Sequence, residues 1–295
     1  MTMNLLTELF AVIGPVFIIA AIGFYWGKSD KSFNTNQLTP IITYIGVPAL
    51  VLSALLRVDL PFNTIGEIGL IAAISITIFG IIGYVVLRIL NLPYRPYLPS
   101  LMFSNNGNMG LSLCLFAFGE EGLALAIAYF AVSAIAQFTI GPAIASGHAS
   151  IIKLLKTPLV WAIICAVILI ESDTTLPRWA DNTINLLGQF TIPLMLFVLG
   201  VSLSRLHIKT FGRSCTMACL RVFGGLVVGY LLATLFELEG AAKGVVIVQA
   251  AMPVAVFNYL FAQLHNNRPE EVASIVVLST ALSFISLPFI LTFIL

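Results

Sequence analysis

Long apolar runs separated by short polar connections fill this sequence. A helix needs about 20 mostly apolar residues to cross a bilayer, and most of these runs reach that length. We expect ten helices, at residues 8–27, 37–57, 64–90, 97–118, 121–146, 157–172, 181–204, 211–236, 241–264 and 270–294. The predicted fold class is therefore an all-α polytopic membrane protein.

Composition agrees with this pattern and excludes several classes of function. The chain has 295 residues, of which 59% are hydrophobic and 9% are charged, whereas soluble domains carry about 25% charged residues. The net charge is +1 and the sequence has no basic cluster, so we expect no nucleic-acid partner. It also lacks a cluster of histidines or carboxylates, so neither an enzyme nor a metal or other cofactor is expected.

Basic residues are divided unequally between the connections. If the N-terminus lies outside, the outer connections hold Arg57, Arg178 and Lys243. The inner connections then hold ten basic residues: Lys28, Lys31, Arg88, Arg95, Lys153, Lys156, Arg205, Lys209, Arg213 and Arg268. Because cytoplasmic loops carry an excess of Lys and Arg, we expect both termini on the outer side of the inner (plasma) membrane.

The chain contains a weak internal repeat with an offset of 146 residues. The segment "IIGYVVLRIL" resembles "VVGYLLATLF", which aligns Tyr84 with Tyr230. The same offset aligns Gly107 with Pro253, and both residues interrupt apolar segments. Internal similarity of this kind is a reason to consider a repeat architecture.

The repeat divides the chain into residues 1–147 and 148–295, each with five predicted helices. Five is an odd number, so the second half would enter the membrane in the opposite orientation. Inverted repeats with interrupted helices at equivalent positions are typical of secondary transporters that bind their substrate near the midplane. The fourth and ninth predicted helices carry these interruptions.

The first interruption, "FSNNGNMGLS", contains Asn105, Asn106 and Asn108 around Gly107. Glycine lowers helix propensity, and Pro253 in the second interruption lacks a backbone N–H. Unpaired backbone groups are costly within a bilayer, and asparagine amides can pair with them. We therefore expect the asparagines to satisfy freed backbone groups, with Asn105 capping the helix that follows it.

If both helices break at mid-membrane and cross, two helix N-termini face the crossing. Each carries roughly half a positive elementary charge, which suits an anion such as a carboxylate. The alternative is that the asparagines only form hydrogen bonds between helices. Arg221, within the eighth predicted helix, has two interpretations as well. It is either a counter-charge for an anionic substrate or a partner for carbonyls freed at the crossing.

These motifs resemble those of the auxin efflux carrier family, over nearly the whole chain. The first crossover of that family typically reads N-T-G-F-L-G-L-P-L, and here it reads "NNGNMGLSL". The matching positions are Asn105, Gly107, Gly110, Leu111 and Leu113, and the departures are Asn106, Asn108 and Ser112.

The second crossover, "AMPVAVFNYLFA", resembles the proline-centred segment of the family, with Pro253 and Asn258 in place. The following "VVLSTALSFISLPF" resembles its last helix. Together, the two crossover segments are more specific than either one alone.

The resemblance implies a ten-helix fold shared in outline with bile-acid/sodium symporters. Helices 1, 2, 6 and 7 would form a scaffold that mediates homodimerisation. Helices 3–5 and 8–10 would form a transport domain that moves against it in an elevator-like way. Known substrates of the family are carboxylates, and the plant carriers hold the carboxylate near the residue that corresponds to Asn105.

The sequence therefore predicts a secondary transporter of small organic anions, with a proton or a sodium ion as a possible coupling ion. Two alternatives stay open, a sodium-coupled symporter of the bile-acid type and a membrane sensor that binds without transport. The candidate substrate-binding residues are Asn105, Asn106, Gly107, Asn108, Ser112, Pro253, Asn258 and Arg221.

Overall fold

The computed structural model describes residues 2–29, 38, 40–57, 61–146, 158–172 and 174–294. Within these ranges the regular structure is helical, apart from one antiparallel bridge between Ser104 and Val254. The predicted all-α class is therefore confirmed. Lys31, Lys153, Lys156 and the predicted boundary between residues 147 and 148 lie outside the described residues.

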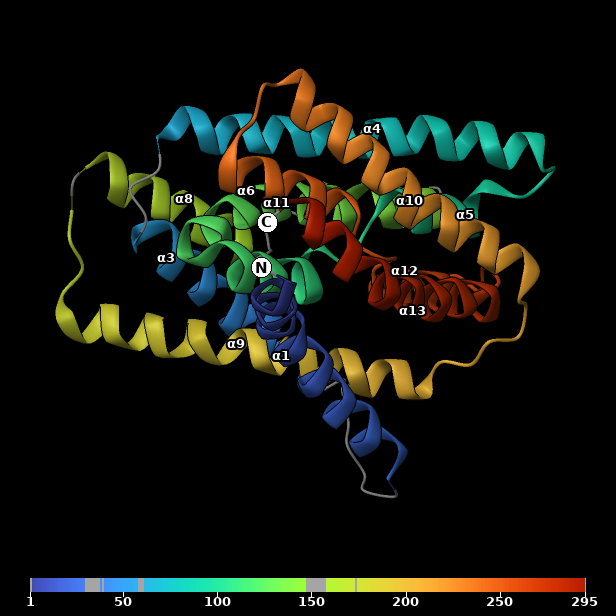
Figure 1. Ribbon diagram of the computed structural model, residues 1–295, viewed down its shortest axis with the longest axis horizontal. Coiled ribbons are helices and arrows are strands. Elements are labelled where there is room, and N and C mark those ends of the chain that lie inside the picture. Colours follow the sequence, from blue (N-terminus) through green and yellow to red (C-terminus); the bar gives the residue numbers. More distant parts are fainter. Residues whose placement is uncertain are drawn as a thin grey trace.

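The described chain has eleven α-helices and two short π-helical segments, η1 and η2 (Figure 1). In order they are α1 (Thr2–Lys28), η1 (Ile42–Gly46), α3 (Val47–Arg57), α4 (Phe62–Ile89), α5 (Tyr94–Met102), η2 (Asn106–Leu111), α6 (Ser112–Ser146), α8 (Pro158–Glu171), α9 (Arg178–Arg205), α10 (Gly212–Leu235), α11 (Gly240–Ala250), α12 (Val256–Leu264) and α13 (Pro269–Ile294).

Six helical segments are long and apolar enough to cross a membrane. They are Phe10–Lys28, Asn63–Ile89, Asn106–Ala145, Arg178–Arg205, Gly212–Leu235 and Pro269–Ile294. Three apolar helices of the described chain are shorter: Ile42–Arg57, Pro158–Glu171 and Gly240–Ala251. The protein is thus a multi-pass membrane protein, while the count of ten crossings stays a prediction.

The predicted helix boundaries agree closely where one apolar run forms one helix. The helix predicted at 64–90 is α4 in the structure, at Phe62–Ile89. The helix predicted at 211–236 is α10, at Gly212–Leu235. The predicted connection between 97–118 and 121–146 lies within α6, where the backbone at Gly119 departs from helical geometry and the helix is kinked. Gly119 has φ 66° and ψ −157°. This backbone conformation is one that glycine adopts readily.

Close backbone approach joins α1 to α9, which pack against each other more extensively than any other pair in the described chain. A Cβ atom at Gly200 would overlap the carbonyl oxygen of Ala20, and one at Gly23 would overlap that of Phe197. Small residues at such positions let membrane helices pack closely. α9 also packs against α3, which in turn packs against α8.

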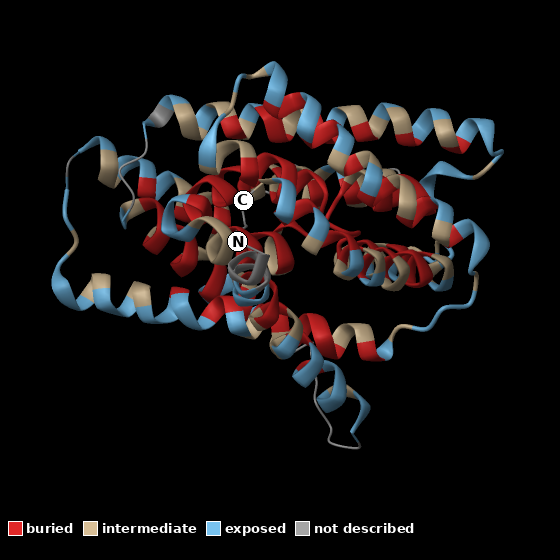
Figure 2. Ribbon diagram, in the orientation of Figure 1, coloured by how far each residue is buried: buried red, intermediate tan, exposed pale blue. Residues whose placement is uncertain are grey.

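Buried residues collect in the middle of the molecule, around α6, α11 and the interrupted segments (Figure 2). Large apolar side chains cover the outer helices instead: Leu70 and Ile81 on α4, and Leu186 and Phe190 on α9, are all exposed. In water such a surface would favour association, whereas in a bilayer it faces lipid tails.

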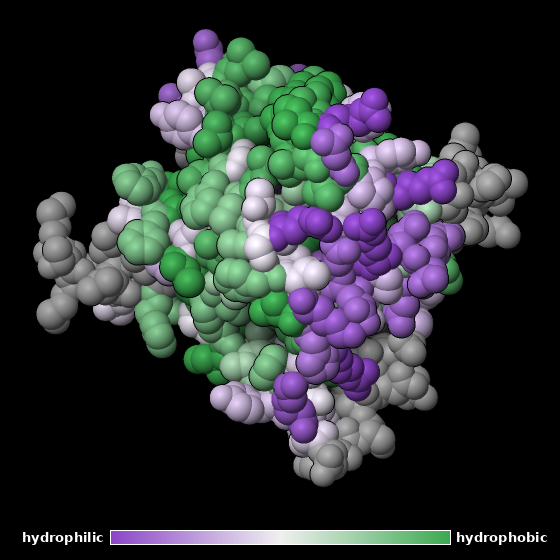
Figure 3. All heavy atoms as spheres, turned by 90° about the vertical axis from the view of Figure 1, so that its right-hand side faces the viewer, coloured by the Kyte–Doolittle hydropathy of each residue, from purple (hydrophilic) through white to green (hydrophobic). Residues whose placement is uncertain are grey.

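Polar side chains gather at one end of the molecule, on the face shown in Figure 3. Glu271 near the start of α13 accepts hydrogen bonds from Arg213 at 3.2 Å and from Arg268 at 3.3 Å. The Tyr97 hydroxyl of α5 also donates to Glu271. The connections before α5, α10 and α13 therefore lie together, as expected if they share one side of the membrane. Which side that is stays a prediction.

Candidate functional site

Two interrupted helices meet at the centre of the molecule. α5 ends at Met102 and η2 begins at Asn106, while α11 ends at Ala250 and α12 begins at Val256. The extended residues between them pair as a minimal antiparallel bridge. The Asn105 N–H donates to the Pro253 carbonyl at 2.7 Å, and the Ala255 N–H donates to the Phe103 carbonyl at 3.2 Å. Each break thus satisfies backbone groups that the other leaves free.

Side chains satisfy further backbone groups of the crossing. The Asn258 amide donates from Nδ2 to the Phe103 carbonyl at 2.9 Å, and the Ser279 hydroxyl accepts from the Val254 N–H at 3.1 Å. Asn105 is the residue that precedes η2, but its side chain makes no capping hydrogen bond. The expected capping role of Asn105 is therefore wrong, because its side chain turns toward the cavity and not toward the N–H groups of η2.

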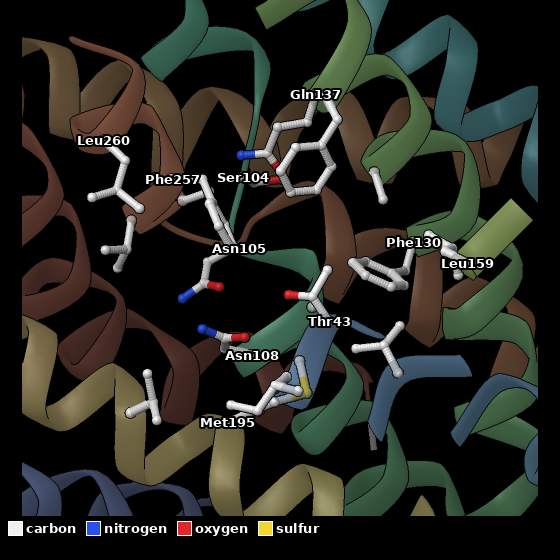
Figure 4. A pocket seen from close by; sticks show the side chains of 18 of the residues that line it. Thr43, Ser104, Asn105, Asn108, Phe130, Gln137, Leu159, Met195, Phe257 and Leu260 are labelled. Carbon is white, nitrogen blue, oxygen red and sulfur yellow. The ribbon is translucent and has the colours of Figure 1, made fainter. Parts of the chain in front are cut away.

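A cavity of about 120 Å³ lies beside the crossing (Figure 4). Both breaks line it, and so do η1, α3, α6, α8 and α9. Its polar side chains are those of Thr43, Ser104, Asn105, Asn108, Gln137 and Ser202. Figure 4 shows the Asn105 and Asn108 amides and the Thr43 hydroxyl pointing into the same space. None of the residues that line the cavity is ionisable.

Two amide groups of this lining have donors without a partner. Nδ2 of Asn105 and Nε2 of Gln137 are both buried, and neither makes a hydrogen bond within the described chain. Buried polar groups in folded proteins are almost always paired. These two donors are therefore available to a hydrogen-bond acceptor inside the cavity.

Some of the predicted site residues line the cavity, and others hold the crossing together. Asn105, Gly107 and Asn108 line the cavity. Asn106 instead turns inward, where it accepts from the Ser104 hydroxyl at 2.7 Å and donates to Ser133 at 2.9 Å. These bonds hold the first break against α6.

Ser112, Pro253 and Asn258 lie outside the cavity lining as well. The Ser112 hydroxyl donates to the Asn108 carbonyl one turn earlier at 3.0 Å, while Pro253 and Asn258 form the backbone contacts of the crossing. Their geometry is that of residues that shape the break.

Arg221 on α10 is 1% exposed and does not line the cavity. It donates from Nη2 to the Ala250 carbonyl at 2.7 Å, and its guanidinium lies 4.1 Å from the centre of the Phe79 ring. Ala250 is the last residue of α11, where carbonyls lack partners within the helix. The geometry thus favours the second interpretation, in which Arg221 pairs with a carbonyl freed at the break.

Gln137 is a polar cavity residue outside the predicted set, as are Thr43, Ser104 and Ser202. It lies on α6 with Phe130 and Ala134, which also line the cavity. The spacing of these three residues puts them on one helical face. A glutamine on an otherwise apolar face was the available signal, but the sequence alone does not say which way that face points.

Metal binding has no support within the described residues, where no group of three or more His, Cys, Asp or Glu side chains is arranged to hold an ion. The chemistry available at the cavity is instead hydrogen-bond donation from amides, hydroxyls and helix starts, in a space enclosed by apolar side chains.

Comparison with known proteins agrees with this arrangement. The model of a family described as "Membrane transport protein" matches residues 143–291, about half of the chain. The chain belongs to this family. The match confirms the resemblance to auxin efflux carriers that the two crossover motifs indicated.

Two archaeal proteins are similar in sequence to this chain. An uncharacterized transporter of Methanothermobacter thermautotrophicus is 25% identical over 283 residues, which cover 92% of this chain and 91% of the relative. An uncharacterized transporter of Methanocaldococcus jannaschii is 29% identical over 196 residues. That alignment covers 62% of this chain and 63% of the relative, which is less than two thirds of the relative's length. This membrane transport protein therefore shares its class with proteins whose substrates are not named.

Proposed function

We propose that this protein is a secondary transporter of small organic anions and holds a carboxylate in the cavity beside the crossing. The observation that carries the proposal is the pair of unpaired donors, Asn105 Nδ2 and Gln137 Nε2, on one cavity. A carboxylate accepts hydrogen bonds through both oxygens and has no donor when ionised. It therefore complements a lining whose unpaired amide groups are donors.

The N-termini of two helices also favour an anion in the cavity. The first N–H groups of a helix have no partner within it, and the helix dipole makes that end positive. Gly107 and Asn108 at the start of η2, and Val256 and Phe257 at the start of α12, all line the cavity. An anion can thus be held without a formal charge from the protein, which matches the uncharged lining.

The size and lining of the cavity favour a small substrate with an apolar part. Its volume of about 120 Å³ is below the range of about 300–1,000 Å³ typical of sites for drug-sized ligands. Phe130, Phe138 and Phe257 line it together with Leu260 and Met195. A short carboxylate would place its charge at the amides and its carbon chain against these side chains.

Helix packing supports the proposed inverted repeat. α1 packs against α9, and the helices at the equivalent positions of the other half, α8 and α3, also pack against each other. In the same way, α4 packs against α6, and their equivalents α10 and α13 pack against each other. Two five-helix halves related by a two-fold axis would produce such pairs. The crossing of the two breaks would then lie on that axis.

The lining of the cavity also comes from both the proposed scaffold and the proposed transport domain. Thr43 on η1, Leu159 on α8 and Met195 on α9 belong to the proposed scaffold, while Asn105 and Val256 belong to the proposed transport domain. Movement of one part against the other would expose the substrate alternately to each side, as in other transporters with inverted repeats. We also propose a homodimer through the scaffold, and both termini outside.

Uptake into liposomes tests this function. Purified protein would be reconstituted and offered radiolabelled succinate, malate, benzoate and indole-3-acetate, with protein-free liposomes as the control. Saturable uptake of at least one carboxylate, inhibited by the unlabelled compound, is the expected result. Binding of a carboxylate without uptake or counterflow would instead identify a sensor, and the absence of both binding and uptake would reject the organic-anion proposal.

A second candidate is sodium-coupled transport. Two buried oxygen atoms beside the second break support it. They are Oε1 of Gln249 and Oδ1 of Asn258, and neither has a hydrogen-bond partner in the described chain. Oxygen ligands suit hard cations. Replacement of sodium by choline in the same assay distinguishes the two candidates, since a sodium-coupled symporter would lose uptake and a sodium-independent carrier would keep it.

A further inference from the structure

A second, larger hollow lies on the membrane-facing surface, away from the crossing. It has a volume of about 900 Å³ and lies between α10, α11 and α13. The side chains that line it are almost all apolar, and we name it the α10–α13 groove. Its residues are Phe223, Leu226, Val227, Tyr230, Leu231, Gly240, Lys243, Ile247, Leu282, Ile285, Ser286, Phe289, Ile290, Phe293 and Ile294.

The walls of the α10–α13 groove offer little to a polar ligand. Ile285 and Phe289 on α13 and Val227 on α10 are largely exposed. The hydroxyl of Ser286 already donates to the Ser283 carbonyl at 3.4 Å. What fits here is a flexible apolar chain that follows the helices.

The length of the groove matches one lipid leaflet. Leu282 and Ile294 on α13 both line it. At a rise of about 1.5 Å per residue, the axial distance between them is about 18 Å. Half of a hydrocarbon core about 30 Å thick is about 15 Å. An acyl chain of a lipid in one leaflet would therefore extend along the groove.

One basic residue lines this apolar groove. Lys243 on α11 has its amine 5.9 Å from the centre of the Tyr230 ring, and both side chains belong to the lining. Such a cation–π contact orients the amine. Lys243 makes no ion pair with the residues that the structure describes. Its charge is thus available to an anionic group at the end of an acyl chain.

We infer that the α10–α13 groove binds an anionic phospholipid, with an acyl chain along α13 and the phosphate at Lys243. The chain supplies the apolar contact and the amine supplies the charge, so a zwitterionic lipid with the same chains should bind less well. This site is separate from the cavity at the crossing and does not depend on the substrate proposed for it.

Native mass spectrometry of the detergent-purified protein tests this inference. The protein would be titrated with phosphatidylglycerol or with phosphatidylcholine of the same acyl chains, and bound lipids counted. We expect several-fold higher occupancy by phosphatidylglycerol, and a loss of about fivefold in Lys243→Gln, which is the effect of one basic residue near an anionic lipid surface. Ile285→Trp, which fills the groove, should lower the occupancy by both lipids.

Lys28→Gln is the matched control. Its amine also lies 5.9 Å from an aromatic ring, that of Phe24, but it does not line the groove. Equal occupancy by the two lipids, or equal losses in Lys28→Gln and Lys243→Gln, would overturn the inference. A change in oligomer mass without a change in bound lipid in Ile285→Trp would also overturn it, because the groove would then be covered by a second copy of the chain.

Discussion

The N–H of Asn105 donates to the carbonyl of Pro253 at 2.7 Å, so the two interrupted helices are joined backbone to backbone at their breaks. This contact leaves the Asn105 side chain free for another purpose. Its amide points into the cavity, where Nδ2 has no partner within the described chain.

Replacement of Asn105 by alanine should weaken substrate binding and leave the fold intact. A hydrogen bond to a charged group contributes about 1.5–3 kcal/mol, so carboxylate affinity should fall about 10- to 150-fold. Isothermal titration with the carboxylate that gives the highest uptake measures this loss. Asn106→Ala is the control, since Asn106 bonds to Ser104 and Ser133 and its loss should lower the melting temperature instead. Unchanged affinity in Asn105→Ala would contradict the site.

Asn258 should matter for stability. Its Nδ2 pairs with the buried Phe103 carbonyl at 2.9 Å. Asn258→Ala leaves this carbonyl with the Ala255 N–H as its partner and should cost about 0.5–1.5 kcal/mol, seen as a lower melting temperature in detergent. Asn182→Ala, at an exposed position of α9, should change the melting temperature little. Equal melting temperatures for the two variants would show that the pairing with Phe103 contributes nothing.

Two adjacent glycines of α10 should respond in opposite ways to substitution by alanine. A Cβ atom at Gly225 would overlap the Ala250 carbonyl, whereas one at Gly224 would meet Phe79 at an ordinary 3.6 Å. Gly225→Ala should therefore destabilise the protein by about 1–3 kcal/mol or more. Gly224→Ala should be neutral or gain up to about 1 kcal/mol from helix propensity. Thermal unfolding of both variants checks the contrast, and a similar response at both positions would argue against close packing of α10 on α11.

Arg221 gives a test that separates its two interpretations. Arg221→Met keeps much of the side-chain volume and removes both the charge and the bond to the Ala250 carbonyl. If Arg221 supports the break, the melting temperature should fall, while the carboxylate affinity of the folded fraction changes less than in Asn105→Ala. A large loss of affinity with an unchanged melting temperature would instead identify Arg221 as the counter-charge of the substrate.

Much of the fold could be predicted because apolar length alone decides where a membrane helix forms. The helix predicted at 181–204, for example, is α9 in the structure, at Arg178–Arg205. The breaks could be located as well, since Pro253 and Gly107 disfavour helix wherever they lie. The kink at Gly119 inside α6 lies between the predicted helices 97–118 and 121–146, so the sequence located this boundary too.

The site was only partly predictable, because lining a cavity depends on how each helix is rotated. Asn105, Asn106 and Asn108 look alike in sequence, yet Asn106 faces Ser133 while the other two face the cavity. Gln137 faces it from α6, several helical turns after the first break. Directions of this kind follow from tertiary packing and not from local pattern.

The bridge between Ser104 and Val254 has a consequence for how this family could diversify. Since main-chain atoms hold the two breaks together, the side chains facing the cavity are largely released from maintaining the architecture. Asn108 and its neighbours at the cavity could then be exchanged over evolutionary time without dismantling the crossing. One backbone frame would thereby accommodate many chemically distinct cargoes.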